Sequence, residues 1–142
     1  MTPDPQNATI ERVLASTRTI AVVGASRDMA KSAHAIPAML QRAGYRIIPV
    51  NPYADQLFGE PVHRSLATID EQIDLVDVFR PSADAAAVVK DAIAAGARAI
   101  WLQQGIVSAE AEALAADAGI DFVQDRCLGV EVRLRGAKPA AR

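Results

Sequence analysis

The sequence has few of the side chains that form covalent or metal-linked structure. Among its 142 residues is one cysteine, Cys127, which excludes an intramolecular disulfide. With only two histidines, the chain also lacks the ligands for a structural zinc site. Aromatic residues make up 4 % of the chain and apolar residues 51 %. We therefore expect one domain with an aliphatic core of Ala, Val, Ile and Leu.

Long apolar runs and an excess of one charge are also absent. No run approaches the roughly 20 apolar residues that a membrane-spanning helix needs. The first seven residues lack the basic segment and apolar run of a signal peptide. A net charge of −2 gives no general attraction for nucleic acid or an anionic membrane. We expect a cytoplasmic protein without nucleic-acid or membrane partners, which binds any anion through a few placed groups.

The clearest positive feature is a near-repeat in which an Ala-rich helical stretch ends in Ala-Gly and a β-rich run follows. It occurs at Ala43-Gly44, Ala95-Gly96 and Ala118-Gly119. Glycine just past a helix end takes the left-handed conformation at little cost. Repeated helix–glycine–strand units predict an α/β, Rossmann-like three-layer fold. Its core would be a parallel sheet of about five strands with helices on both faces.

The predicted domain spans residues 8–134, between a disordered N-terminus (1–7) and a flexible C-terminal tail (135–142). A helix follows the loop that ends at Lys31 and runs to about Ala43. Pro37 implies that this helix either begins later than Ser32 or is kinked. We predict the other helices at 8–16, 83–95 and 109–118, a short helical turn at 66–72, and strands at 19–23, 46–50, 75–79, 99–102 and 121–124.

The carboxyl ends of parallel strands share one edge of a sheet, where such folds bind ligands. The loop Gly24-Ala25-Ser26 follows the first strand and precedes a helix, a setting in which backbone N–H groups can approach a phosphate. Ser26 adds a hydroxyl donor, and Ser32 either caps the helix or contacts a phosphate. Two cations, Arg27 and Lys31, belong to the same segment. A tight turn also needs a glycine without any ligand, so both interpretations of Gly24 stay open.

The other strand ends supply further candidates. Asn51 and Pro52 form either a simple chain reversal or a contact with ribose, phosphate or adenine. Phe79 offers an apolar wall and Arg80 a cation that is either a ligand contact or a solvated surface charge. The side-chain amide of Gln103 suits a neutral part of a ligand.

Several features argue against an NAD site or an obvious catalytic centre. Ser26 and Met29 occupy the second and third glycine positions of the dinucleotide fingerprint, and Asn51 replaces the acidic residue that holds the ribose. Neither histidine has a serine or cysteine partner near it in sequence, so we expect surface histidines. Cys127 is either a buried small hydrophobe or a thiol made reactive by Arg126.

In order along the chain, these motifs resemble the CoA-binding protein family, stand-alone relatives of the domain that opens the α subunit of succinyl-CoA synthetase. The resemblance implies coenzyme A along the strand ends of a Rossmann-like fold. Phosphates would lie near Gly24, Ser26, Lys31 and Ser32, and adenosine near Asn51, Pro52, Phe79 and Arg80. The matching segments are 20–26, 31–32, 44–52, 59–60, 74–80, 101–105 and 125–127.

The synthetase relatives depend on a phosphorylated histidine in a second domain. The short segment after Gln124 contains no histidine. We therefore expect a non-catalytic module for CoA, an acyl-CoA or a CoA disulfide. The alternatives are an NADP-linked oxidoreductase that uses Arg27 or Arg80 for the extra phosphate, and a regulatory partner of a larger acyl-CoA enzyme.

Overall fold

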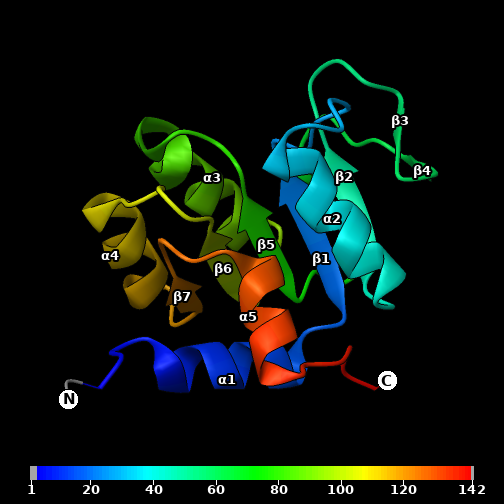
Figure 1. Ribbon diagram of the computed structural model, residues 1–142. Helices are drawn as coiled ribbons and strands as arrows, with labels where there is room; N and C mark the ends of the chain where they lie inside the picture. The colour runs from blue at the N-terminus through cyan, green and yellow to red at the C-terminus, as the bar shows by residue number, and fades with distance from the viewer. Residues whose placement is uncertain (1–2, 142) are drawn as a thin grey trace.

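A parallel five-stranded sheet in the order β2-β1-β5-β6-β7 forms the centre of the computed structural model (Figure 1). The structure describes residues 3–141. The predicted parallel α/β fold is confirmed, because every pair of neighbouring strands in this sheet runs in the same direction. The strands are β1 (Thr19–Val23), β2 (Arg46–Val50), β5 (Leu75–Val78), β6 (Ala99–Leu102) and β7 (Asp121–Val123).

Two apolar clusters lie on opposite faces of the sheet, since successive strand residues alternate between faces. One cluster joins Leu75 and Trp101 to helices α1 (Asn7–Ser16), α2 (Ser32–Arg42) and α5 (Leu128–Arg135). The other joins Val76 and Ile100 to α3 (Ser82–Ala94) and α4 (Ala109–Asp117). No helix in the described part of the chain has the length and apolar character needed to traverse a membrane.

Helix α5 and a small hairpin were not predicted. The hairpin pairs β3 (Gln56–Leu57) with β4 (Glu60–Pro61), and a 3-10 turn η1 (Leu66–Thr68) follows, shorter than the predicted helical turn at 66–72. Helix α5 packs closely on α2. A Cβ added at Gly129 would lie 2.7 Å from the Met39 Cε atom.

Helix α2 begins at Ser32 and includes Pro37, so it does not start later than Ser32. Proline has no N–H, and the carbonyl oxygen of Ala33 therefore lacks the helical donor that any other residue at position 37 would supply. The backbone N–H of Ser26 donates to this oxygen instead, at 3.1 Å. The proline thus leaves an acceptor that anchors the loop after β1.

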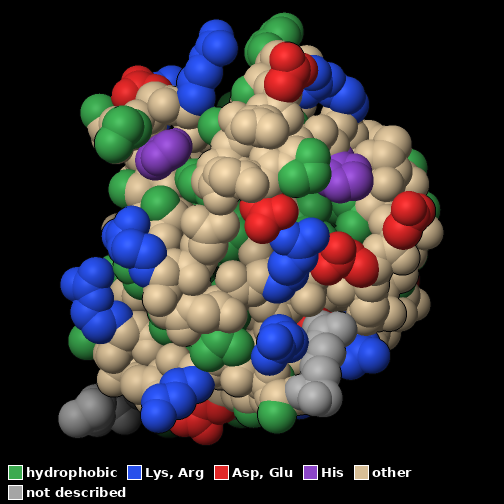
Figure 2. Space-filling view, turned by 90° about the vertical axis from the view of Figure 1, so that its right-hand side faces the viewer, with side chains coloured by type: hydrophobic (Ala, Val, Ile, Leu, Met, Phe, Trp, Pro, Cys, Tyr) green, Lys and Arg blue, Asp and Glu red, His purple; other side chains and the backbone are tan. Residues whose placement is uncertain are grey.

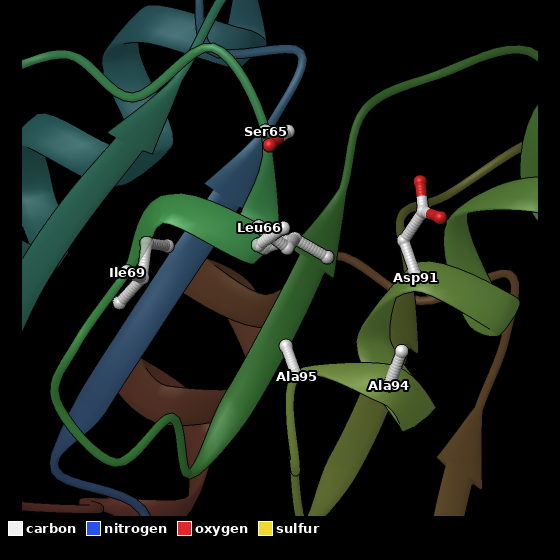
Figure 3. Close-up of a pocket in the computed structure, with 7 residues that line it drawn as sticks. Ser65, Leu66, Ile69, Asp91, Ala94 and Ala95 are labelled. Carbon is white, nitrogen blue, oxygen red and sulfur yellow. The ribbon is translucent and has the colours of Figure 1, made fainter.

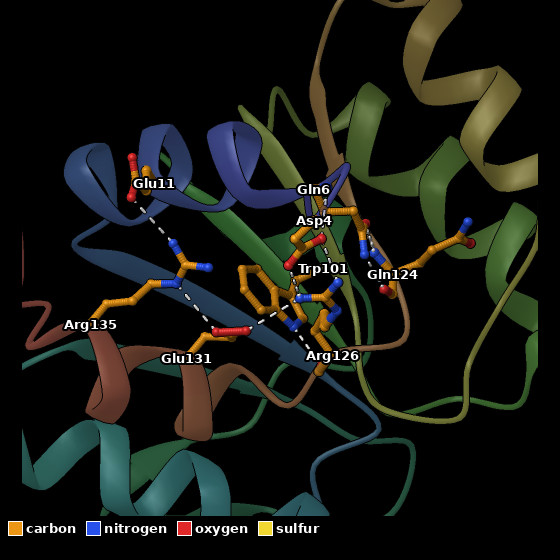
Figure 4. A network of polar contacts seen from close by, with 8 residues as sticks. All are labelled: Asp4, Gln6, Glu11, Trp101, Gln124, Arg126, Glu131 and Arg135. Atoms are coloured by element: carbon orange, nitrogen blue, oxygen red, sulfur yellow. Dashed lines mark hydrogen bonds and ion pairs between the residues drawn. The ribbon is translucent and has the colours of Figure 1, made fainter. Parts of the chain in front are cut away.

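The hydrogen-bonded fold extends beyond the predicted bounds of 8 and 134. Gln6 and Gln124 exchange two hydrogen bonds of 2.8 and 2.9 Å. Arg126 contacts the Asp4 carboxylate at 2.7 Å (Figure 4). Near the other end, the N–H of Ala140 donates to the carbonyl of Thr17 at 2.9 Å. Local composition did not reveal these contacts, because each partner is distant in sequence.

Candidate functional site

The loops after β1, β2 and β5 meet around a hollow of ≈ 290 Å³, which we call the first depression. Most of the predicted ligand residues line it, and Ala33 and Tyr53 are additions that the sequence did not indicate. Its lining consists of Gly24, Ala25, Ser26, Lys31, Ala33, Asn51, Pro52, Tyr53, Phe79 and Arg80.

A second depression of ≈ 240 Å³ adjoins the first, because Phe79 lines both. Ser32 and Gln103 lie here, as predicted ligand residues, with Gln104, Ile106 and Cys127. Arg27 is exposed and lines neither depression. The structure therefore brings the predicted residues together along one edge of the sheet, apart from this arginine.

A larger hollow of ≈ 490 Å³ lies between η1 and the C-terminal end of α3 (Figure 3). Asp91 is the only charged side chain among its described lining residues. This end of α3 leads into the start of β6, so the hollow is away from the carboxyl ends of the strands. Its lining lacks the converging polar groups that fix a polar ligand, which the two smaller depressions have.

Gly24 allows the loop after β1 to approach the end of β5. Its φ is +88°, and an added Cβ would lie 3.1 Å from the carbonyl oxygen of Phe79. Its N–H donates to the carbonyl of Val50 at 3.2 Å, which removes this amide from the set of phosphate donors. Close backbone packing alone therefore explains the glycine.

Ser26 is held at its backbone by the first turn of α2. Its N–H donates to Ala33, as described above, and the His34 Nδ1 atom lies 2.7 Å from its carbonyl oxygen. Its Oγ atom accepts a 3.0 Å hydrogen bond from the N–H of Asp28 and keeps its own proton for donation. The hydroxyl, not the amide, is thus the group that Ser26 offers a ligand.

The start of α2 supplies amides in place of those of Gly24 and Ser26, which are occupied. Among the described residues, the N–H groups of Ser32 and Ala33 have no hydrogen-bond partner. They carry the partial positive charge of a helix N-terminus, and Lys31 precedes them directly. Ser32 faces the second depression and Ala33 the first, so this turn lies where the two meet.

Asn51 connects the loops after β2 and β1. Its Nδ2 atom donates to the carbonyl of Ala25 at 2.7 Å. Its Oδ1 atom accepts from the N–H groups of Tyr53 and Ala54, at 2.6 and 2.7 Å. The amide is therefore occupied by the backbone, and Asn51 acts as a positioning residue. Pro52 and Tyr53, the latter 82 % exposed, form the rim that it supports.

Two cations give the first depression its charge. Lys31 and Arg80 line it, and none of its described lining residues is acidic. Arg80 also forms a 2.9 Å ion pair with Asp84, four residues further on, and both side chains remain about half exposed. Such exposed pairs hold a guanidinium loosely, so Arg80 can turn toward an anion at little cost.

The second depression is uncharged at its surface but has a carboxyl group close by. Gln103 is 5 % exposed, and its Nε2 atom donates to Asp77 Oδ1 at 2.6 Å. Burial raises the pKa of Asp77 to about 7, against the opposing effect of the Gln103 hydrogen bond. Asp77 was not among the predicted site residues, although a lone acidic residue within the apolar strand 75–79 was a usable signal.

Cys127 is half-buried rather than buried, and it lines the second depression just before α5. The neighbouring Arg126 guanidinium is engaged elsewhere, with Asp4 and, at 3.5 Å, with Glu131 (Figure 4). Its hydrogen bond with Asp4 lowers the pKa of that carboxyl to about 2. The indole N–H of Trp101 donates to the Arg126 carbonyl, which fixes the segment to the sheet.

Both histidines lie outside the lining of the two depressions. His34 packs its ring against Phe58 with centroids 5.0 Å apart. His63 pairs through Nδ1 with the Thr68 hydroxyl at 2.7 Å. Both rings reach the surface in Figure 2, where basic and acidic side chains are interspersed. These contacts are structural.

The parallel sheet and the paired depressions at its strand ends place the protein among Rossmann-like α/β proteins. A family model described as a CoA binding domain matches residues 18–133, and the chain belongs to this family. The predicted family relationship is thereby confirmed.

Three relatives illustrate the range of the family. The uncharacterized protein YneT of Bacillus subtilis is 37 % identical over 127 residues, which is 89 % of this chain and 94 % of YneT. The structure of a hypothetical protein from Pyrococcus horikoshii has a TM-score of 0.89 at 29 % identity, covering 94 % of this chain and 96 % of that one.

A third relative is much longer. The structure of the dinucleotide-forming acetyl-coenzyme A synthetase 1 of Ca. Korarchaeum cryptofilum, in complex with phosphate and ADP, matches with a TM-score of 0.69 at 26 % identity. The match covers 82 % of this chain but 27 % of the synthetase chain. The fold therefore occurs both alone and as part of a larger enzyme.

Proposed function

We propose that this protein binds coenzyme A, or an acyl or disulfide derivative of it, across the two adjoining depressions as a non-catalytic cytoplasmic module. CoA is polyanionic at its nucleotide end and uncharged along its pantetheine arm. The observation that carries the proposal is the matching division of the site: Lys31 and Arg80 line one depression, and uncharged side chains line the surface of the other.

The first depression suits the nucleotide. Lys31 and Arg80 provide charge for the phosphates, and the Ser26 hydroxyl adds a donor. The unpartnered amides of Ser32 and Ala33 carry the partial positive charge of the helix N-terminus, which favours an anion. Pro52, Tyr53 and Phe79 offer apolar surface for adenine.

The second depression suits the pantetheine arm, which carries two amides. Gln103 and Gln104 provide complementary amide groups, and Phe79 and Ile106 provide apolar contacts. Cys127 lies at this end of the site, where the ligand's thiol or thioester would arrive.

Charge reversal tests the phosphate assignment. Lys31→Glu should weaken CoA binding roughly tenfold or more, because a charge-assisted contact becomes repulsive. Arg27→Glu is the matched control, since Arg27 belongs to the same loop but lines neither depression. Equilibrium dialysis with CoA would compare both variants with the wild type. Equal losses in the two variants, or none in Lys31→Glu, would contradict the assignment.

Mass spectrometry of the small molecule released from the purified protein separates this proposal from the nicotinamide alternative. CoA or a CoA derivative supports it. Recovery of NADP without CoA would support an oxidoreductase instead. The occupied amide of Asn51 stands where NAD enzymes place a ribose-binding carboxylate, which favours the first outcome.

A further inference from the structure

Asp77 lies in the middle of the sheet with its side chain fully buried, 0 % exposed. In register, its strand neighbours are Val22 on β1 and Trp101 on β6. Its Oδ2 atom has no hydrogen-bond partner among the described residues. A buried carboxyl with an unpartnered oxygen is costly, and a hydrophobic residue would suit the apolar strand better. This cost suggests that Asp77 has a role at the neighbouring site.

The carboxyl group is one hydrogen bond away from the second depression, because its partner Gln103 lines that depression. Asp77 and Phe79 are two residues apart and so share a face of the sheet. Gln103 belongs to the same face, because it bonds to Asp77 and follows Trp101 by two residues. Phe79 and Gln103 both line the depression. Along the strand, one repeat of roughly 7 Å separates Asp77 from Phe79, which lines the depression.

The pair also fixes the orientation of the Gln103 amide. Asp77 accepts from Nε2, and the N–H of Leu128 points to Oε1 at 3.4 Å. A flipped amide would set its NH₂ group against the Leu128 N–H, so the observed orientation is the stable one. One N–H and one lone pair of Gln103 remain for the ligand, which suits an uncharged amide or thioester.

We propose that Asp77 is a specificity-determining residue that makes the second depression accept an uncharged acyl end of the ligand and reject an acyl group that ends in a carboxylate. This inference rests on the proposed binding of CoA. A second negative charge in the depression would lie near the Asp77 carboxylate, with little water between them to screen the repulsion. The affinity for an acyl group that ends in a carboxylate should therefore fall as Asp77 ionises.

Neighbouring charges do not neutralise Asp77. The neighbours of Asp77 on the adjoining strands are Val22 of β1 and Trp101 and Gln103 of β6, none of which is charged. Helix α5 contributes the backbone N–H of Leu128, which points to Gln103. On α2, His34 is turned to the Ser26 carbonyl and Arg42 is exposed. Lys31 and Arg80 line only the first depression. Among the described residues that line the second depression, which do not include Asp77 itself, Cys127 is the only one with a titratable side chain.

The test uses two stable thioethers of CoA that have the same shape, carbamoylethyl-CoA and carboxyethyl-CoA. Their affinities would be measured by calorimetry between about pH 6 and pH 8, a range that includes the Asp77 pKa of about 7. Taking the ratio of the two affinities cancels every titration that affects the shared nucleotide. In the wild type, preference for the uncharged thioether should grow roughly five- to tenfold with rising pH.

Asp77→Asn keeps an oxygen to accept from Gln103 but removes the charge. In this variant the ratio should stay constant with pH, and carboxyethyl-CoA should bind more tightly than it does to the wild type at about pH 8. Cys127→Ser, which removes the other titratable group, should retain the wild-type pH dependence. A pH-independent ratio in the wild type would overturn the inference even if Asp77→Asn fails to fold.

The outcomes also separate this inference from the proposed function. If CoA and both thioethers bind with a constant ratio, or with equal pH dependence in wild type and Asp77→Asn, only the role of Asp77 is refuted. If CoA itself does not bind, the proposed function fails, and this inference fails with it.

Discussion

At the scale of single residues, Asp77 links stability to pH. Its pKa is about 7 in the folded protein, above the ordinary 3.8, because burial disfavours the charged form. The folded state therefore binds more protons than the unfolded state between these two values. Stability falls as pH rises through this range and is constant above it.

Asp77→Asn should abolish this dependence. The difference in free energy of unfolding between the variant and the wild type should shift in favour of the variant by roughly 3 kcal/mol from about pH 5 to about pH 8. Urea denaturation at each pH measures it. The test is how this difference changes with pH. Its absolute size at any one pH is not informative, since the new amide also changes local packing. A difference that stays the same at every pH would refute the raised pKa.

Gly24 combines a positive φ with close backbone packing. Gly24→Ala would combine a positive φ with a Cβ only 3.1 Å from a backbone oxygen. Gly96→Ala is a matched control, because Gly96 has φ +78° and no atom within 4 Å of the added Cβ. We expect a loss of about 1 kcal/mol for the control and of roughly 2 to 4 kcal/mol for Gly24→Ala in chemical denaturation. Equal losses would contradict the close approach of the loop to β5.

At the scale of elements, α2 and the loop after β1 form one unit. Pro37 leaves the Ala33 carbonyl to the Ser26 amide, and His34 holds the Ser26 carbonyl. The position of the Ser26 hydroxyl at the first depression depends on both contacts. A proline inside a helix thus organises the site one turn away.

Pro37→Ala would restore a helical N–H that competes for the Ala33 oxygen. The Ser26 amide should then exchange with solvent faster than in the wild type, as followed residue by residue by NMR. The Ala43 amide provides an internal control, because its bonds to Met39 and Leu40 are at the far end of the helix. Unchanged protection of Ser26 would show that the proline does not anchor the loop.

The sheet and four helices were predictable because local patterns encode them. Continuous apolar runs marked buried strands such as Leu75–Val78, and alanine-rich segments followed by glycine marked helix ends. Helix α5 was missed because Leu128–Arg135 contains a glycine and its apolar residues alternate with polar ones, a period typical of a strand and not of a helix. Its stability comes from packing on α2, which no local pattern records.

The residues of the candidate site could be predicted from the sequence, but the hydrogen bonds among them could not. Strand ends converge in any parallel sheet, so the residues that follow them could be named in advance. Which groups remain available to a ligand depends on tertiary partners. The Asn51 amide donates to Ala25, and one of the two N–H groups of the Gln103 amide donates to Asp77, each partner being 26 residues away in sequence.

At the scale of the whole molecule, Asp4 and Gln6 are bonded to the segment that joins β7 to α5. Asp4 pairs with Arg126, which also contacts Glu131 on α5, while Gln6 pairs with Gln124 (Figure 4). The Asp4 carboxyl has a lowered pKa, so its contribution to stability is present above the ordinary value of 3.8 and is lost as pH falls toward about 2.

Asp4→Asn should lower the melting temperature at neutral pH, and the difference from the wild type should vanish toward about pH 2. Asp70→Asn is the control, since Asp70 is exposed and has no hydrogen bond or ion pair among the described residues. Differential scanning calorimetry across this range measures both. A difference that persists at the lowest pH would show that Asp4 contributes through something other than its charge.

The central claim is that the two depressions together receive one molecule of coenzyme A. Isothermal titration of the purified protein with CoA, beside an identical titration with NADP, tests it most directly. The account predicts saturable binding of CoA at one site per chain and no comparable binding of NADP. Saturation by NADP with no heat from CoA would contradict it.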